Sequence, residues 1–125
     1  MKRIIKTSDA PAAIGPYSQA VEINGTLYVS GQIAIDPETG KLIDGDIQAQ
    51  TRQIFRNIEA ILKTAGYSFA EVVKSTVFLS DISNFKTMNE VYAQIYFENP
   101  PARSAFAVKE LPLGALIEIE TIAAK

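Results

Sequence analysis

The sequence contains no cysteine and no histidine among its 125 residues. It therefore offers no thiol nucleophile, no Ser–His pair, no imidazole base and no zinc site of the Cys/His type. Any acid–base chemistry must come from Asp, Glu, Lys, Tyr, main-chain groups or bound water. Carboxylates alone could still hold a metal, but the acidic residues are scattered rather than spaced like metal ligands, so we expect no metal.

Strong charge of one sign and long apolar runs are also missing. The formal net charge is −2, and the nearest approach to a basic cluster is Lys2-Arg3 with Lys6. Nucleic-acid binding normally needs a basic face that neutralises several phosphates, so we expect small molecules and protein partners instead. No stretch is apolar over the length of a bilayer, and the N-terminus does not resemble a signal peptide. These features predict no membrane partner and a cytoplasmic location.

The chain length fits one domain with one core, and no repeat or linker divides residues 1–125. Asn24-Gly25 between β-forming segments predicts a hairpin of residues 20–23 and 26–30. A second hairpin is expected from residues 32–35 and 41–43, around a turn that contains proline and glycine.

Helical periodicity begins after Asp46. Apolar residues recur every three or four positions up to Ala65, with Asp46 as a suitable N-cap and Gly66 as a suitable C-terminal residue. Ser83 is a possible cap for a second helix, which is expected to stop before Pro100 because proline disfavours helix at and before its own position.

The remaining strands are expected at residues 71–79, 104–110 and 116–123. Strands and helices in this order predict an α+β fold with two helices packed on one face of a mixed six-stranded sheet. In the first of these strands Val77 and Leu79 point to one face and Phe78 to the other. Because two helices cover only one face, the apolar second face indicates an oligomer.

Arg103 is the leading candidate for a functional residue. It follows Pro100-Pro101-Ala102, a stiff segment between a helix and a strand. A guanidinium held at a fixed angle can bind a carboxylate through two parallel hydrogen bonds. The alternative is an ordinary surface ion pair with an aspartate or glutamate.

Five further residues are weaker candidates when each is taken alone. Glu118 shares a strand face with Glu120 and could orient a water molecule, or simply face solvent. The others are Tyr17 in a turn, Ser30 and Gly31 at a strand end that glycine allows to bulge, and Asn89 within the second helix. Core packing, a strand kink and a solvated amide are the respective alternatives.

Several segments together resemble the Rid (YjgF-like) family of reactive intermediate deaminases. They are Ala10-Pro11-Ala12-Ala13-Ile14-Gly15-Pro16-Tyr17-Ser18-Gln19-Ala20, Ser30-Gly31-Gln32-Ile33, Gln50-Thr51-Arg52-Gln53 with Asn57, and Val73-Lys74-Ser75-Thr76-Val77-Phe78-Leu79. The most specific is Pro100-Pro101-Ala102-Arg103-Ser104, followed by Leu111-Pro112 and Ile117-Glu118-Ile119-Glu120. The resemblance extends over essentially the whole chain.

The resemblance implies an activity, a fold and an assembly. Members hydrolyse reactive enamines and imines, such as 2-aminoacrylate, 2-iminopropanoate and 2-iminobutanoate, to 2-keto acids and ammonia without a cofactor. It implies a chorismate-mutase-like (ferredoxin-like) fold in a trimeric barrel, a homotrimer with a site in each cleft between subunits.

The resemblance also assigns roles to individual residues. Arg103 would bind the substrate carboxylate and Glu118 would position the attacking water. Tyr17, Ser30 and Asn89 would line the site, and Gly31 lies in the same motif as Ser30. Many members carry cysteine where this chain has Ala105, so thiol chemistry is not expected here. The alternatives are a non-catalytic module that binds small carboxylates such as 2-keto acids, and an RNA-cleaving activity, which the charge balance and the absence of histidine disfavour.

Overall fold

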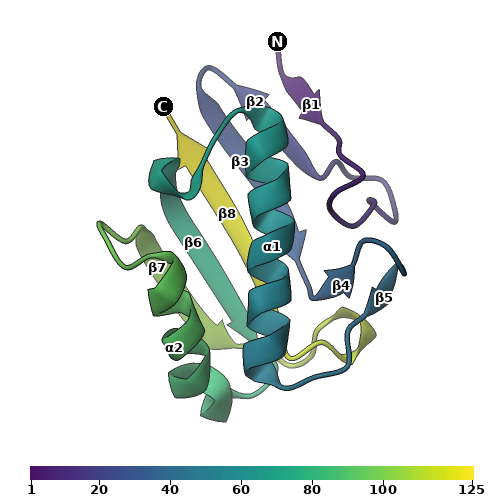
Figure 1. Ribbon diagram of the computed structural model, residues 1–125, viewed down its shortest axis with the longest axis vertical. Helices are drawn as coiled ribbons and strands as arrows, with labels where there is room; N and C mark the ends of the chain where they lie inside the picture. The colour runs from purple at the N-terminus through teal and green to yellow at the C-terminus, as the bar shows by residue number, and fades with distance from the viewer.

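A computed structural model describes residues 1–125, whose main sheet has six strands in the order β1-β2-β3-β8-β6-β7 (Figure 1). The strands are β1 (Arg3–Ile5), β2 (Ala20–Ile23), β3 (Thr26–Gln32), β6 (Val72–Leu79), β7 (Ala102–Ala107) and β8 (Ile117–Ala124). Only β6 and β7 run parallel, and every other neighbouring pair is antiparallel. The sheet is therefore mixed, as the sequence predicts.

The hairpin of β2 and β3 forms where Asn24-Gly25 predicts it. Both turn residues have positive φ, 49° at Asn24 and 77° at Gly25, as a type I′ turn requires. Further along, the register of β3 against β8 shifts between Val29 and Gln32. This bulge contains Gly31 and confirms the irregularity that the Ser30-Gly31-Gln32 sequence permits.

The expected second hairpin forms, but its first strand is shorter than residues 32–35, because β3 stops at Gln32. A separate two-stranded sheet follows, made of β4 (Ile35–Asp36) and β5 (Lys41–Leu42). The cause lies in the first helix, where the Asn57 side-chain amide donates to the carbonyl oxygens of Ile33 and Ile35, the latter at 2.9 Å. These carbonyl groups are thus turned toward a helix rather than toward a neighbouring strand.

The first helix, α1 (Ile47–Ala65), has the predicted limits. The Asp46 carboxylate accepts a hydrogen bond from the Ala49 N–H, and Gly66 ends the helix with φ of 86°. The predicted apolar stripe is buried against the sheet. Its buried hydrophobic residues are Ile47, Ile54, Phe55, Ile58, Ile61, Leu62 and Ala65.

The second helix, α2 (Phe85–Ile95), does not begin with the predicted cap. The Ser83 side chain does not cap it; instead the Asp81 carboxylate accepts a hydrogen bond from the Ser83 N–H at 2.9 Å. Asp81 thereby caps a short 3₁₀ turn, Ile82–Asn84, that leads into the helix. Aspartate is as good a cap as serine. Because Asp81 comes two residues before Ser83, the helical turns begin at Ile82.

The last two strands differ slightly from their predicted limits. β7 begins at Ala102 and ends at Ala107, so Lys109 and Glu110 lie beyond it. Its partner β6 explains the end, because Ala107 pairs with Leu79, the last residue of that strand. A parallel edge strand with one neighbour cannot extend past that neighbour.

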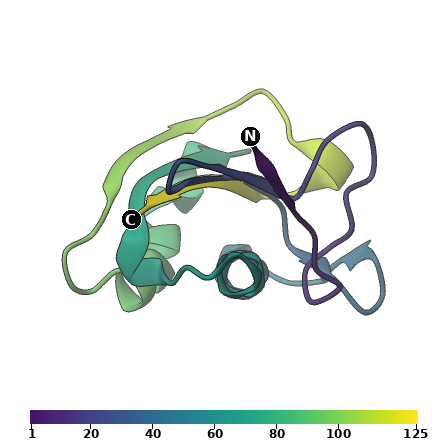
Figure 2. The same ribbon diagram turned by 90° about the horizontal axis from the view of Figure 1, so that it is seen from above.

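Both helices lie on the same face of the curved sheet (Figure 2). Val77 and Leu79 are fully buried on this face, whereas Phe78 points to the other face and is only partly buried. Neither α1 nor α2 covers that second face, and Ile4, Tyr28 and Phe106 are exposed among the large hydrophobic side chains. The sheet is open in one chain, with β1 and β7 as its edges. Neither helix combines the length and apolar character needed to cross a membrane.

Candidate functional site

Arg103 lies on the helix-covered face of the edge strand β7. It pairs with Ser75 of β6, which is fully buried beneath the helices. Its Nη1 donates a 2.6 Å hydrogen bond to Oδ1 of Asn89 in α2. The guanidinium carbon is 4.7 Å from the ring centre of Tyr92 and 5.3 Å from that of Phe85. One helix therefore supplies the hydrogen bond and both aromatic rings that contact the guanidinium.

The Arg103 guanidinium has no acidic partner in the chain. The single ion pair joins Arg3 to Glu22 at the opposite edge of the sheet. A guanidinium has five N–H donors, and Asn89 accepts from one nitrogen only. The expectation of an ordinary surface ion pair is therefore wrong, and a half-buried cation retains donors for an external anion.

Glu118 points to the other face of the sheet. It pairs with Phe78 of β6, whereas Arg103 pairs with Ser75, and alternate residues of a strand point to opposite faces. The Glu118 carboxylate lies over Gly31 in the β3 bulge. A Cβ on Gly31 would lie 2.9 Å from Cδ of Glu118 and would overlap its carboxylate oxygen. Glycine is therefore needed here for space rather than for backbone conformation.

The environment of Glu118 disfavours its charged form. Burial raises the pKa of this carboxyl above its ordinary value of 4.5, and the nearby Glu120 carboxylate raises the pKa further. Glu118 forms no ion pair within the chain. A carboxylate with a raised pKa is a better proton acceptor when it is ionised.

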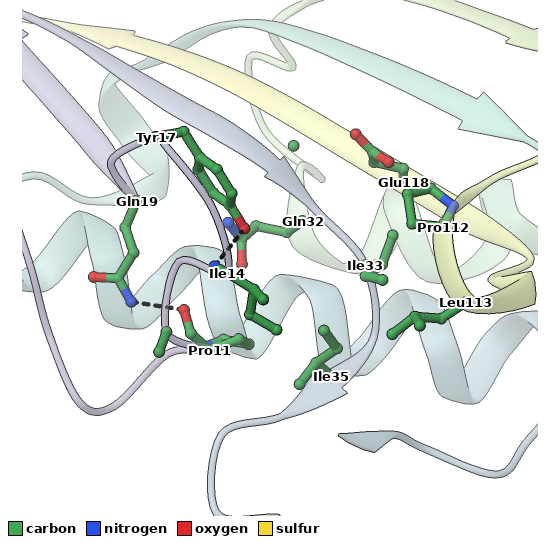
Figure 3. Close-up of a pocket in the computed structure, with 12 residues that line it drawn as sticks. Pro11, Ile14, Tyr17, Gln19, Gln32, Ile33, Ile35, Pro112, Leu113 and Glu118 are labelled. Atoms are coloured by element: carbon green, nitrogen blue, oxygen red, sulfur yellow. Dashed lines mark hydrogen bonds between the residues drawn. The ribbon is translucent and has the colours of Figure 1, made fainter. Parts of the chain in front are cut away.

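A cavity of about 420 Å³ opens beside Glu118 (Figure 3). Its wall includes Tyr17 and Gly31, together with residues to which the sequence motifs assigned no individual role. These are chiefly Gln32 at the end of β3, Ile33 after it, Ile35 of β4, Pro112 and Leu113 before β8, and Pro11 and Gln19 in the N-terminal loop. Most of them are apolar, and Glu118 is the only ionisable carboxyl among the lining residues.

Leu113 is the least expected of these lining residues. It has φ of 58°, a left-handed conformation that is unusual for leucine, and its side chain is 66% exposed. Only the neighbouring Pro112 and Gly114 hint at a turn in the sequence, and neither predicts which side chain faces the cavity. Backbone strain at an exposed apolar residue is typical of functional loops.

The N-terminal loop is tied to the sheet by one buried amide. Gln19 accepts from the Thr7 N–H at 2.7 Å and donates to the carbonyl oxygens of Thr7 and Pro11 at 3.0 and 2.8 Å. The Ser30 hydroxyl donates to the Ser18 carbonyl at 2.6 Å, which fixes the end of the loop against β3. Ser30 is absent from the cavity wall, so its expected contact with substrate stays a prediction.

Tyr17 stands at the rim of the cavity with half of its surface exposed. Its hydroxyl accepts a hydrogen bond from the Ile14 N–H at 3.2 Å, so the ring is held by its own loop (Figure 3).

The predicted site residues thus form two groups within one chain. Tyr17, Gly31 and Glu118 meet at the cavity on one face, while Asn89 and Arg103 lie together on the other. Nowhere in the chain do three or more Asp, Glu, His or Cys side chains gather as metal ligands would.

The comparison with known proteins decides the family. A family model described as Endoribonuclease L-PSP matches residues 7–125. A crystal structure of a Rid-family protein of unknown function from Yersinia pestis is 50% identical, with a TM-score of 0.95 and all of both chains covered. The chain belongs to the Rid family. The resemblance inferred from its motifs is confirmed.

The curated relatives of this Rid chain carry different names. A human protein named 2-iminobutanoate/2-iminopropanoate deaminase is 50% identical, over 98% of this chain and 90% of the human one. A RutC family protein of Pyrococcus horikoshii is 54% identical, over 100% of this chain and 99% of its own. The Rid family is therefore shown, with imine deaminases among its members, whereas the names do not agree on one activity.

Proposed function

We propose that this Rid protein hydrolyses small reactive imines, such as 2-iminopropanoate and 2-iminobutanoate, to 2-keto acids and ammonia. The observation that carries the proposal is Arg103, a half-buried guanidinium with a fixed position and no acidic partner. Such a group is suited to the carboxylate that every substrate of this class carries. The name of the human relative, half of whose residues are identical, supports the same reaction.

The chemistry needs only modest help from the protein. Water adds to the carbon of the protonated C=N bond while the Glu118 carboxylate takes a proton from that water. In the resulting carbinolamine, Glu118 gives that proton to the amine nitrogen and then takes the proton of the hydroxyl group, as the C–N bond breaks and the C=O bond forms. Ammonia leaves and carries the last proton away from Glu118 as ammonium. Anchoring and alignment of reactants are worth roughly 7–11 kcal/mol in ideal intramolecular models, so no activated nucleophile is required.

The proposed site spans two copies of the chain. Arg103 and Glu118 lie on opposite faces of one sheet, so a substrate of a few atoms cannot contact both within one chain. We propose that Arg103 of one subunit meets Glu118 of the next in a homotrimer. The uncovered apolar face, where the rings of Phe78 and Phe106 pack edge to face at 5.4 Å, supports burial by another chain.

A trapping assay tests the reaction. A dehydratase or an amino-acid oxidase generates the imine, semicarbazide captures it, and the protein competes for it. We expect the wild type to suppress semicarbazone formation and Arg103→Ala to leave it unchanged. Imines from several amino acids should be tried, and a wild type without effect on any of them would overturn the proposal.

The alternative is a module that binds 2-keto acids without turnover. Binding requires Arg103 alone, whereas hydrolysis also requires Glu118. Calorimetric titration with 2-oxobutanoate separates the two cases. In the deaminase, Glu118→Gln should retain keto-acid binding and lose turnover. In a binding module, the wild type should bind 2-oxobutanoate and show no turnover at all.

A further inference from the structure

Three side chains of α2 surround the Arg103 guanidinium. Phe85, Asn89 and Tyr92 are four and three residues apart, so they project from the same side of the helix. Tyr92 and Phe85 present their rings at 4.7 and 5.3 Å from the guanidinium carbon, and Asn89 accepts the 2.6 Å hydrogen bond. We name Phe85 and Tyr92 the aromatic clamp.

The aromatic clamp takes the place of a counter-ion. Arg103 is half-buried on an edge strand, and no carboxylate lies within ion-pair distance of it. The negative faces of aromatic rings attract a guanidinium without consuming its N–H donors. An aspartate or glutamate in the same place would hold Arg103 equally well, but it would compete with any incoming carboxylate.

The ring of Tyr92, rather than its hydroxyl, contacts Arg103. The buried hydroxyl is directed at the Ser75 hydroxyl and forms no hydrogen bond with Arg103. Asn89, in turn, uses its side-chain oxygen on Arg103. Both residues therefore contact Arg103 directly.

We propose that Phe85 and Tyr92 are positioning residues, which fix the plane of the Arg103 guanidinium and so preform a receptor for the substrate carboxylate. This inference rests on the proposed function and deepens it. Because a preformed receptor loses less side-chain freedom on binding, the clamp contributes to affinity more than to the chemical step.

The chain supplies a matched control in Tyr96. Tyr92 and Tyr96 are one helical turn apart and are 7% and 6% exposed. Their ring centres are 5.0 Å apart in one aromatic cluster, but only the Tyr92 ring contacts Arg103. Leucine at either position therefore removes the same group from the same cluster, and only one of the two changes opens the clamp.

Steady-state kinetics of the full-length variants test the positioning role. Tyr92→Leu and Phe85→Leu should raise KM roughly three- to thirtyfold and change kcat much less, on the usual strength of a cation–π contact. Tyr92→Phe should keep the wild-type KM, because it keeps the ring. Tyr96→Leu should lower Tm and leave KM unchanged. Equal effects of Tyr92→Leu and Tyr96→Leu on KM, or a Tyr92→Phe variant as impaired as Tyr92→Leu, would overturn the proposal.

A second readout does not depend on turnover. The ¹H–¹⁵N signal of the Arg103 side chain, assigned by its loss in Arg103→Lys, should shift in Tyr92→Leu and stay in place in Tyr96→Leu. If the protein hydrolyses imines but the Arg103 signal does not move in Tyr92→Leu, the positioning role of the clamp is wrong and the proposed function stands. A wild type that neither hydrolyses imines nor binds 2-oxobutanoate would overturn the proposed function, and the role of the clamp in binding with it.

Discussion

The two faces of the sheet hold their charged residues in opposite ways. Arg103 is immobilised by an amide and two aromatic rings from one helix. Glu118 faces a glycine and another carboxylate, and its pKa is raised by burial and by Glu120. The cation is thus held rigidly by neutral groups, while the anion is kept in surroundings that disfavour its charge. A rigid group suits binding, and a carboxylate with a raised pKa suits proton transfer.

Mixing two inactive variants should give the largest effect. Arg103→Ala and Glu118→Ala should each lower kcat/KM about a hundredfold or more, because each removes a charged group from the reacting centre. If every site combines Arg103 of one subunit with Glu118 of the next, mixed oligomers formed by co-refolding regain intact sites. In a closed ring with equal amounts of both chains, about a quarter of the sites are intact.

The trapping assay on the co-refolded mixture measures this recovery. Each variant refolded alone is the control. A mixture no more active than its components would show that both residues act within one subunit, which would contradict the two-face arrangement of the proposed site.

Gly31→Ala should selectively impair the Glu118 face. The new methyl group would occupy the space of the Glu118 carboxylate, which has to turn away. Because the φ of Gly31 is not in the left-handed region and the carboxylate end can move, we expect a small change in Tm and a loss of kcat of about tenfold or more. Calorimetry beside the kinetic assay separates the two effects. A large fall in Tm with kcat preserved would contradict the placement of Glu118.

The raised pKa of Glu118 predicts a stability that depends on pH. Its pKa is higher in the folded chain than the ordinary value of 4.5, so the free energy of unfolding falls as pH rises from about 4.5 through the folded pKa, and the loss persists at neutral pH. Glu118→Gln should therefore raise Tm at pH 7, with the gain vanishing below pH 4.5.

This comparison is best made with Arg103→Ala as the parent, so that no Arg103 from another subunit can offset the charge. Thermal unfolding followed between pH 4 and pH 8 measures the effect. An unchanged or lower Tm of the double variant at pH 7 would contradict the unfavourable surroundings of Glu118.

The smallest effect is expected at Leu113. Glycine adopts its φ of 58° without strain but loses more freedom on folding, so Leu113→Gly should stabilise the protein by at most about 1 kcal/mol. Urea unfolding measures this difference. Because Leu113 lines the cavity, KM for bulky aliphatic imines should rise more than KM for 2-iminopropanoate; equal changes would show that Leu113 does not contact the substrate side chain.

Local signals predicted most of the fold. Asn24-Gly25, the caps Asp46 and Gly66 and the stripe of α1 depend on neighbouring residues, and all formed as expected. Apart from the cap of α2, where the nearby Asp81 replaces Ser83, the errors arose where distant residues decide. Asn57 binds the carbonyl groups at the start of the second hairpin and the end of β6 at Leu79 limits β7.

The arrangement of the site residues was harder to predict from the sequence than the fold. Motifs placed Arg103 and Glu118 on the right strands, but only the register against β6 reveals that they point to opposite faces. The aromatic clamp was missed because Phe85 and Tyr92 read as ordinary core residues of an amphipathic helix. Their contact with Arg103 depends on how α2 lies across the edge strand, which residue spacing cannot specify.

Because the Gln19 amide anchors the N-terminal loop, the anchoring does not depend on the side chains of the loop that line the cavity. This amide binds main-chain atoms of Thr7 and Pro11, so it does not depend on which side chains those positions carry. The one exception is proline at position 7, which would have no N–H to donate to Gln19. Neighbouring wall residues such as Ala12 and Ile14 can therefore vary without releasing the loop. A fold built in this way can acquire new substrates by point substitutions in the loop, while its stability stays with the sheet and α1.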